Sequence, residues 1–145
     1  MALEFKWLIR NEVILQRIEG EMSIDDLRNM AMTLIDMVEQ SKRPLVHHIV
    51  DTRLMTQMPL NVREMSQNLF EPLRHPRYGW AIIIGKHDPV TKSVLSMALQ
   101  INKIRYRFVP DPIDAARVIQ EQDSAISPIA IDELMAFCGQ VAENN

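Results

Sequence analysis

The chain has 145 residues, of which 47% are hydrophobic and 24% are charged, and its formal net charge is −3. This composition is typical of an ordinary globular protein and excludes a disordered or fibrous chain. The slightly acidic balance predicts no broad basic surface for nucleic acid. Cys138 is the only cysteine, so the sequence excludes an internal disulfide and a cysteine-rich zinc site.

The first ten residues lack the long apolar core of a signal peptide. No apolar run approaches the ~20 residues that span a bilayer. We therefore expect a cytoplasmic protein with no transmembrane segment. No repeat, low-complexity tract or long linker divides the chain, which predicts one domain over residues 1–145, with a core over about 5–121.

Two β-prone runs, at residues 5–9 and 13–18, flank a turn and predict a hairpin. Ser23 and Asp26 match a capping box, and apolar residues then recur with the helical period of one buried face. This pattern predicts a helix that stops near Ser41, because a proline follows shortly after.

The middle of the chain alternates strands and helices. The compact apolar run at 45–50 predicts a central strand that ends at Asp51. Asn61 and Glu64 then start a second helix, in the manner of a capping box. The apolar run at 80–84 is the strongest signal for a buried strand.

The last third begins with Asp88 followed by proline, a helix start. The apolar face expected for this helix consists of Val90, Val94, Met97, Ala98 and Ile101. A short strand at 106–109 and a second Asp-Pro start at Asp111 follow. A final helix is expected over about 128–142, with Cys138 on its buried side.

The predicted order is therefore β-β-α-β-α-β-α-β-α plus a C-terminal helix. Strands that alternate with helices favour right-handed crossovers onto a mostly parallel sheet, and the leading hairpin makes the sheet mixed. The predicted class is α/β.

This order resembles the STAS family, in particular its SpoIIAA-like, STAS/SEC14-like branch. Three segments carry the resemblance, at residues 44–51, 58–60 and 73–80. The resemblance implies a regulatory or ligand-binding module without catalytic machinery. It also implies a phosphoacceptor serine where the second helix begins, but Pro59-Leu-Asn-Val62 offers no hydroxyl there.

Asp51 follows a central strand, at the end of the sheet where α/β proteins bind ligands. Arg53 and the amides at the Asn61 helix start could join it around a small anionic group, with Arg63 nearby. The alternative is that Asp51 orders its own loop by pairing with Arg53 or Arg63. The basic pair Arg74 and His75 is a second candidate site and could bind an acidic partner. The alternative is that this pair is ordinary solvent-exposed surface.

The sequence contains no group of residues with the spacing typical of a catalytic or metal site. His47 and His48 are adjacent on a strand and point to opposite faces, so they cannot hold one metal together. With 4 glycines the chain builds no common nucleotide loop, and no cofactor is expected. The remaining enzymatic alternative is a metal-free hydrolase or isomerase whose catalytic residues are scattered along the chain and form no motif.

We therefore predict a non-catalytic regulatory or ligand-binding protein, a homodimer that binds a protein partner or a small anionic ligand. The alternative is a SEC14-like carrier of an apolar or lipid ligand. The ten methionines are compatible with both functions, because methionine fills core gaps and lines adaptable surfaces.

Overall fold

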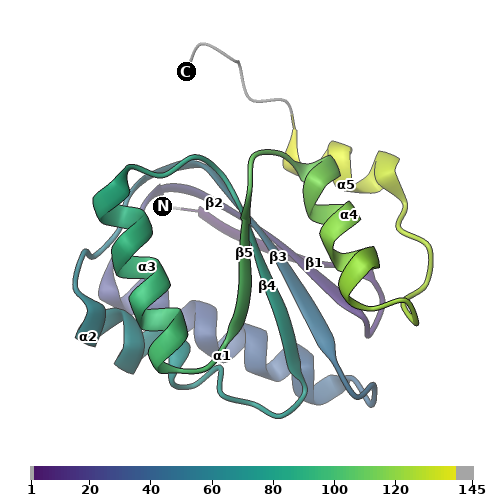
Figure 1. The fold of residues 1–145 in the computed structure, drawn as a ribbon, viewed down its shortest axis with the longest axis horizontal. Helices are drawn as coiled ribbons and strands as arrows, with labels where there is room; N and C mark the ends of the chain where they lie inside the picture. The colour runs from purple at the N-terminus through teal and green to yellow at the C-terminus, as the bar shows by residue number, and fades with distance from the viewer. Residues whose placement is uncertain (1, 140–145) are drawn as a thin grey trace.

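The computed structural model describes residues 2–139 and contains one five-stranded sheet with helices on both faces (Figure 1). In chain order the elements are β1 (Ala2–Ile9), β2 (Val13–Glu21), α1 (Ile24–Gln40), β3 (Val46–Gln57), α2 (Val62–Met65), the π-helical segment η1 (Ser66–Phe70), β4 (Tyr78–Ile84), α3 (Pro89–Ile101), β5 (Arg105–Val109), α4 (Pro112–Gln122) and α5 (Ile131–Cys138). The predicted order of strands and helices is confirmed.

The strands lie side by side in sequence order, from β1 to β5. β1 pairs with β2 antiparallel, and the other three pairs are parallel, so the sheet is mixed as expected. The hairpin turns at Asn11, whose φ of 66° is a left-handed conformation that asparagine tolerates.

The helix starts follow the predicted side-chain caps. Ser23 Oγ accepts a hydrogen bond from the Asp26 N–H, and the Asp26 carboxylate accepts one from the Ser23 N–H, at 3.1 and 2.8 Å. Asn61, Asp88 and Asp111 each accept the N–H three residues on, at 3.0, 2.9 and 2.8 Å. These caps satisfy backbone donors that a helix start leaves free, which explains where each helix begins.

Each face of the sheet has its own core. α1, α2, η1 and α3 cover one face, where Ile14, Val50 and Ile83 are buried. α4 and α5 cover the other, where Leu15 and Ile49 are buried. Because side chains alternate along a strand, neighbouring residues of β3 serve different cores.

The predicted buried face of α3 is wrong in part, since Ala98 is buried and Val94 packs against the core as expected, but the other three residues do not. The helix buries Thr91, Leu95, Ala98 and Leu99, while Val90, Met97 and Ile101 are 62%, 53% and 55% exposed. The sequence carries two apolar stripes, and the structure turns the leucine stripe inward. Asn102 fixes this rotation, because its buried amide donates to Ser66 Oγ and to the Ala98 carbonyl.

Two boundaries also differ from expectation. β3 continues past Asp51 to Gln57, because its polar second half pairs with the end of β2. The last helix begins at Ile131 instead of near 128, since Ser127 is held in the preceding loop by two hydrogen bonds to the Glu12 carboxylate. The predicted end of this helix at 142 lies outside the described residues. Among residues 2–139, no helix combines the length and the apolar character needed to cross a bilayer.

Candidate functional site

The carboxyl ends of β3 and β4 and the first turn of α3 surround a surface hollow of about 280 Å³, called here the β3–α3 hollow. Parallel sheets place ligands at this end of their strands. Its walls are Met55, Thr56, Gln57, Met58, Leu60, Lys86, His87, Asp88 and Thr91. The hollow thus combines apolar side chains with one ammonium group and one imidazole.

His87 is held in one tautomer at this site. Thr52 Oγ1 donates its only proton to the Ile84 carbonyl at 2.7 Å, so His87 Nε2, at 2.9 Å from Oγ1, must donate to it. Nδ1 is therefore the unprotonated nitrogen of the neutral ring. Burial lowers the pKa of His87, which favours this neutral form.

Gly85 completes this arrangement. A Cβ at Gly85 would lie 2.6 Å from Thr52 Oγ1, and its φ of 144° is one that other residues rarely adopt. Opposite it, Asp88 is fully engaged as the cap of α3, with one oxygen on the Thr91 N–H and the other on Thr91 Oγ1. Lys86 and Leu60 are exposed, so the site presents an ammonium group and an apolar side chain to a partner.

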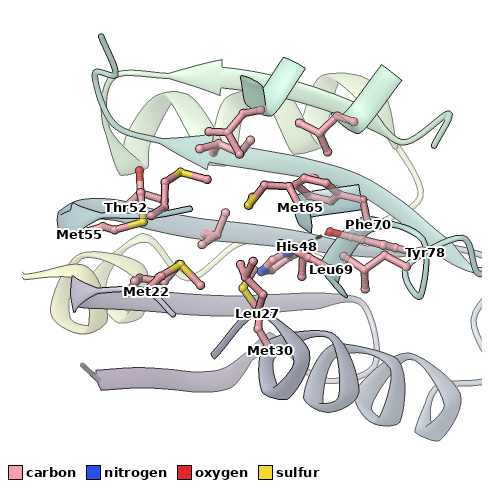
Figure 2. A pocket seen from close by; sticks show the side chains of 18 residues that line it. Met22, Leu27, Met30, His48, Thr52, Met55, Met65, Leu69, Phe70 and Tyr78 are labelled. Atoms are coloured by element: carbon pink, nitrogen blue, oxygen red, sulfur yellow. Dashed lines mark hydrogen bonds between the residues drawn. The ribbon is translucent and has the colours of Figure 1, made fainter. Parts of the chain in front are cut away.

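Behind the hollow lies an internal cavity of about 50 Å³, called here the methionine cavity (Figure 2). Its lining is almost wholly apolar and includes Met22, Met30, Met55, Met58 and Met65. Met55 and Met58 line both spaces, so these two side chains form the wall between them. Methionine is flexible and packs adaptably, which makes this wall easier to rearrange than one of branched residues.

A buried polar group of three side chains borders the cavity. His48, which lines it, lies between Tyr78 Oη on its Nδ1 side and Gln16 Oε1 on its Nε2 side, at 2.8 and 2.7 Å. Burial lowers the pKa of His48 to about 3 and raises that of Tyr78, so both are neutral at pH 7. Gln16 Nε2 is buried without a hydrogen-bond partner within the described residues.

Asp51 belongs to the opposite face of the sheet. It is 2% exposed, and its two oxygens accept hydrogen bonds from Arg53 Nε and Nη2 at 3.0 and 2.9 Å. Arg53 Nη2 also reaches the Gly139 carbonyl at 3.4 Å, and Arg17 Nη1 donates to the Phe137 carbonyl at 3.1 Å. Two guanidinium groups thus hold the C-terminal end of α5, where helix carbonyls lack partners.

The six predicted site residues fall into three separate pairs. Asp51 and Arg53 lie on the face that α5 covers, whereas Asn61 and exposed Arg63 lie at the start of α2 on the other face. The predicted cradle of Asp51, Arg53 and the Asn61 helix start is therefore not assembled. The reason is that Asp51 and Arg53 share one side of an alternating strand, and each satisfies the other.

The third pair, Arg74 and His75, precedes β4 and so lies at the far end of the sheet from the hollow. Arg74 Nε donates to Asn102 Oδ1 at 2.8 Å, and His75 Nδ1 accepts the Arg77 N–H at 3.1 Å. Both side chains therefore have structural partners, Arg74 at the end of α3 and His75 within its own loop.

The sequence reasoning missed Lys86, His87 and Thr52. The one available signal was their place after buried strands, because parallel strands end at the same edge. Gln16 and Tyr78 give no sequence signal, because their hydrogen bonds to His48 join β2, β3 and β4 and span 32 and 30 positions of the chain. Within residues 2–139, no three His, Cys, Asp or Glu side chains are placed to share a metal ion.

Comparisons with known proteins bear on the fold. No protein-family model matches the sequence, and no curated protein matches it either. An uncharacterised protein of the DUF3478 family with a SpoIIAA-like fold, from Shewanella loihica PV-4, superposes with a TM-score of 0.58 at 15% identity, over 81% of this chain and 91% of that one. The anti-sigma factor antagonist SpoIIAA in its unphosphorylated form superposes with a TM-score of 0.53 at 14% identity, over 81% and 96%.

Both similarities cover most of each chain. At 15% and 14% sequence identity, these similarities show the fold alone. The chain has a SpoIIAA-like, STAS-type α/β fold.

Proposed function

We propose that this protein is a non-catalytic regulatory or ligand-binding module that acts through the β3–α3 hollow and its rim. The observation that carries the proposal is the exposed apolar rim of a hollow at the carboxyl end of the sheet. Leu60 on its wall is 52% exposed, and Val90 stands beside Thr91 in the first turn of α3. Exposed apolar side chains that gather around a concave surface are typical of interaction sites.

The fold neighbour SpoIIAA, an anti-sigma factor antagonist, supports a role in protein binding. In the sequence resemblance, the phosphoacceptor position of the family corresponds to residues 59–62, and Leu60 of this segment lines the hollow. Here Asn61 holds the helix start through its hydrogen bond to the Glu64 N–H. We therefore propose binding at this surface without a phosphorylation switch at that position.

A charge placed on the rim tests this proposal. Purified Leu60→Asp protein should lose cellular proteins that the parent captures, because aspartate is costly to bury in an interface. Ile113→Asp is the matched control, since Ile113 is 48% exposed on α4, over the other face of the sheet. Equal capture by all three proteins, read by quantitative mass spectrometry, would reject the rim as the working surface.

The second candidate function is carriage of an apolar ligand, and the methionine cavity favours it. At about 50 Å³ it is well below the ~300–1,000 Å³ of ordinary ligand pockets, so a ligand would have to displace the methionine side chains. Met55 and Met58 offer a route, because they separate the cavity from the hollow. The small volume is the reason we rank this function second.

Native mass spectrometry of gently purified protein distinguishes the two functions. A reproducible extra mass that extracts into organic solvent supports the carrier, and its absence supports the binding module. Ala81→Val adds methyl groups at the cavity wall and should reduce that extra mass, whereas Ala125→Val, at an exposed position, should not. The same spectrum reports the subunit count and so tests the homodimer expected from the sequence.

A further inference from the structure

The free edge of β5 is the first of two features that point to another binding surface. β5 is the last strand of the sheet and, among residues 2–139, pairs with β4 alone. Figure 1 shows it in the foreground, between α3 and α4, with no other segment in front of it. An unpaired strand edge presents backbone N–H and C=O groups that can pair with another extended chain.

The second feature is charge. Residues 72–110 contain seven Lys or Arg side chains and one acid, a net charge of +6 in a chain of net charge −3. The one acid is Asp88, whose carboxylate already caps α3. Four of the cations flank the β5 edge, and all four are exposed: Lys92, Lys103, Arg105 and Arg107.

These four cations have no acidic partner within the part of the chain that the structure describes: no carboxylate oxygen lies within 4 Å of any of them. Two of them lie over aromatic rings instead. The Arg107 guanidinium is 5.8 Å from the centre of the Trp80 ring, and Lys92 Nζ is 5.3 Å from that of Phe108. Trp80 and Phe108 belong to opposite faces of the sheet, so cations flank the edge on both sides.

We propose that the β5 edge binds an acidic, extended polypeptide segment, which adds to the sheet as a sixth strand. The unpaired backbone favours a polypeptide over a nucleic acid, because only a polypeptide can continue the ladder of hydrogen bonds. The unpartnered cations select an acidic sequence. A second copy of this chain, paired edge to edge, would place these cations against themselves.

This inference goes beyond the proposed function, since none of the four cations lines the β3–α3 hollow. One other role accounts for the same charges. Cations on an edge strand prevent edge-to-edge aggregation, and natural sheets use them in this way. That role alone predicts no affinity for an acidic strand, so a binding experiment separates the two.

The probe is a fluorescent peptide of alternating glutamate and threonine, about ten residues long, which is the upper range of strand lengths. A second peptide has the same sequence with N-methyl groups on alternate backbone amides, which removes strand pairing and keeps the charge. Oligothymidylate of similar length serves as a polyanion without a peptide backbone. Fluorescence anisotropy reports the affinity of each for the full chain.

We expect the unmodified peptide to bind at least roughly tenfold more tightly than the N-methylated peptide or oligothymidylate. Arg105→Glu/Arg107→Glu should lower its affinity by a similar factor. Arg10→Glu/Lys42→Glu should not, because it makes the same charge change at two exposed cations outside the β5 region.

No binding of the acidic peptide would overturn the proposal and leave the arginines as guards against aggregation. Equal binding of the N-methylated peptide or of oligothymidylate would also overturn it, by showing a general polyanion surface. If the double glutamate variant does not fold, Arg105→Gln/Arg107→Gln replaces it. The comparison of the two peptides on the parent protein tests the proposal without any variant.

Discussion

The imidazole of His47 occupies the space that a side chain on Gly79 would need. A Cβ built on Gly79 would lie 2.4 Å from His47 Nδ1, and the same Nδ1 accepts the Trp80 N–H at 3.0 Å. His47 Nε2 lies 2.8 Å from Asp123 Oδ2, to which it donates. The ring is thus fixed between β4 and the end of α4, and the glycine allows β3 and β4 to pair around it.

Gly79→Ala should therefore lower the free energy of unfolding by about 1–3 kcal/mol, the usual cost of overpacking a well-packed site. His47→Ala removes the obstructing ring, so the glycine substitution should cost less in that background. Urea denaturation of the parent, the two single variants and the double variant measures this difference. Strictly additive effects would contradict the steric explanation.

Asn61→Ala should lower the free energy of unfolding by about 1 kcal/mol, because it removes the side-chain cap of α2. Asn61→Ser is the matched control, since a serine hydroxyl can accept the same Glu64 N–H. Thermal or urea unfolding measures both variants. A cost of zero for alanine would show that the start of α2 does not depend on this cap.

Acid should destabilise the protein partly through His48. Its pKa is about 3 in the folded protein and 6.5 as the ordinary value, so below pH 6.5 the unfolded chain binds a proton that the folded chain excludes. The stabilising contribution is complete above pH 6.5 and is lost as the pH falls from there toward 3. The slope is at most about 1.4 kcal/mol per pH unit for this one group.

Urea denaturation between pH 7 and 4.5 measures this slope in the parent and in His48→Gln. The variant should be less stable at pH 7 and should show a shallower dependence on pH. His47 and His87, whose pKa values are also lowered by burial, contribute to the slope that remains. Asp123, whose pKa is lowered to about 2, adds to it at the acid end of the range. An unchanged slope in His48→Gln would contradict the assignment of a buried neutral His48.

Cys138 reports whether α5 is docked. Its thiol is buried, and burial together with the neighbouring Asp51 carboxylate raises its pKa to about 12, so the native protein should react slowly with thiol reagents. Arg17→Ala removes a charged hydrogen bond to the Phe137 carbonyl, worth about 1.5–3 kcal/mol. We expect roughly a tenfold or greater increase in labelling rate at pH 7.

Lys6→Ala is the control for this measurement. Lys6 Nζ lies over the Phe137 ring at 5.9 Å, so it touches the same helix through a weaker contact. Its labelling rate should rise less than that of Arg17→Ala. Equal rates in the parent and in Arg17→Ala would show that Arg17 does not hold the end of α5.

The sequence was a good guide wherever a local signal sufficed. The caps at Ser23, Asn61, Asp88 and Asp111 are read from short motifs, and each forms the expected hydrogen bond. α3 shows the limit of such reading. Its two apolar stripes satisfy the helical period equally well, and packing in the folded chain decides between them, including the hydrogen bond from Asn102 to Ser66.

The candidate site was harder to predict, because its residues meet only through the sheet. The sequence correctly predicts Asp51 on a central strand. The face that its side chain occupies depends on alternation along β3, and its partner Arg53 lies on the same face. His87 and Thr52 are thirty-five positions apart. The π-helical segment over the methionine cavity has no sequence signal that we recognise, since its residues also suit an α-helix.

The charge distribution along the chain has a consequence for how this protein meets other molecules. Residues 72–110 carry a net charge of +6, whereas residues 111–139, which form α4 and α5, carry six acids and one arginine, a net charge of −5. The molecule is therefore an electric dipole despite its modest total charge. A charged partner would be turned toward one side before contact, and this steering would raise the association rate most at low ionic strength, where screening extends over longer distances.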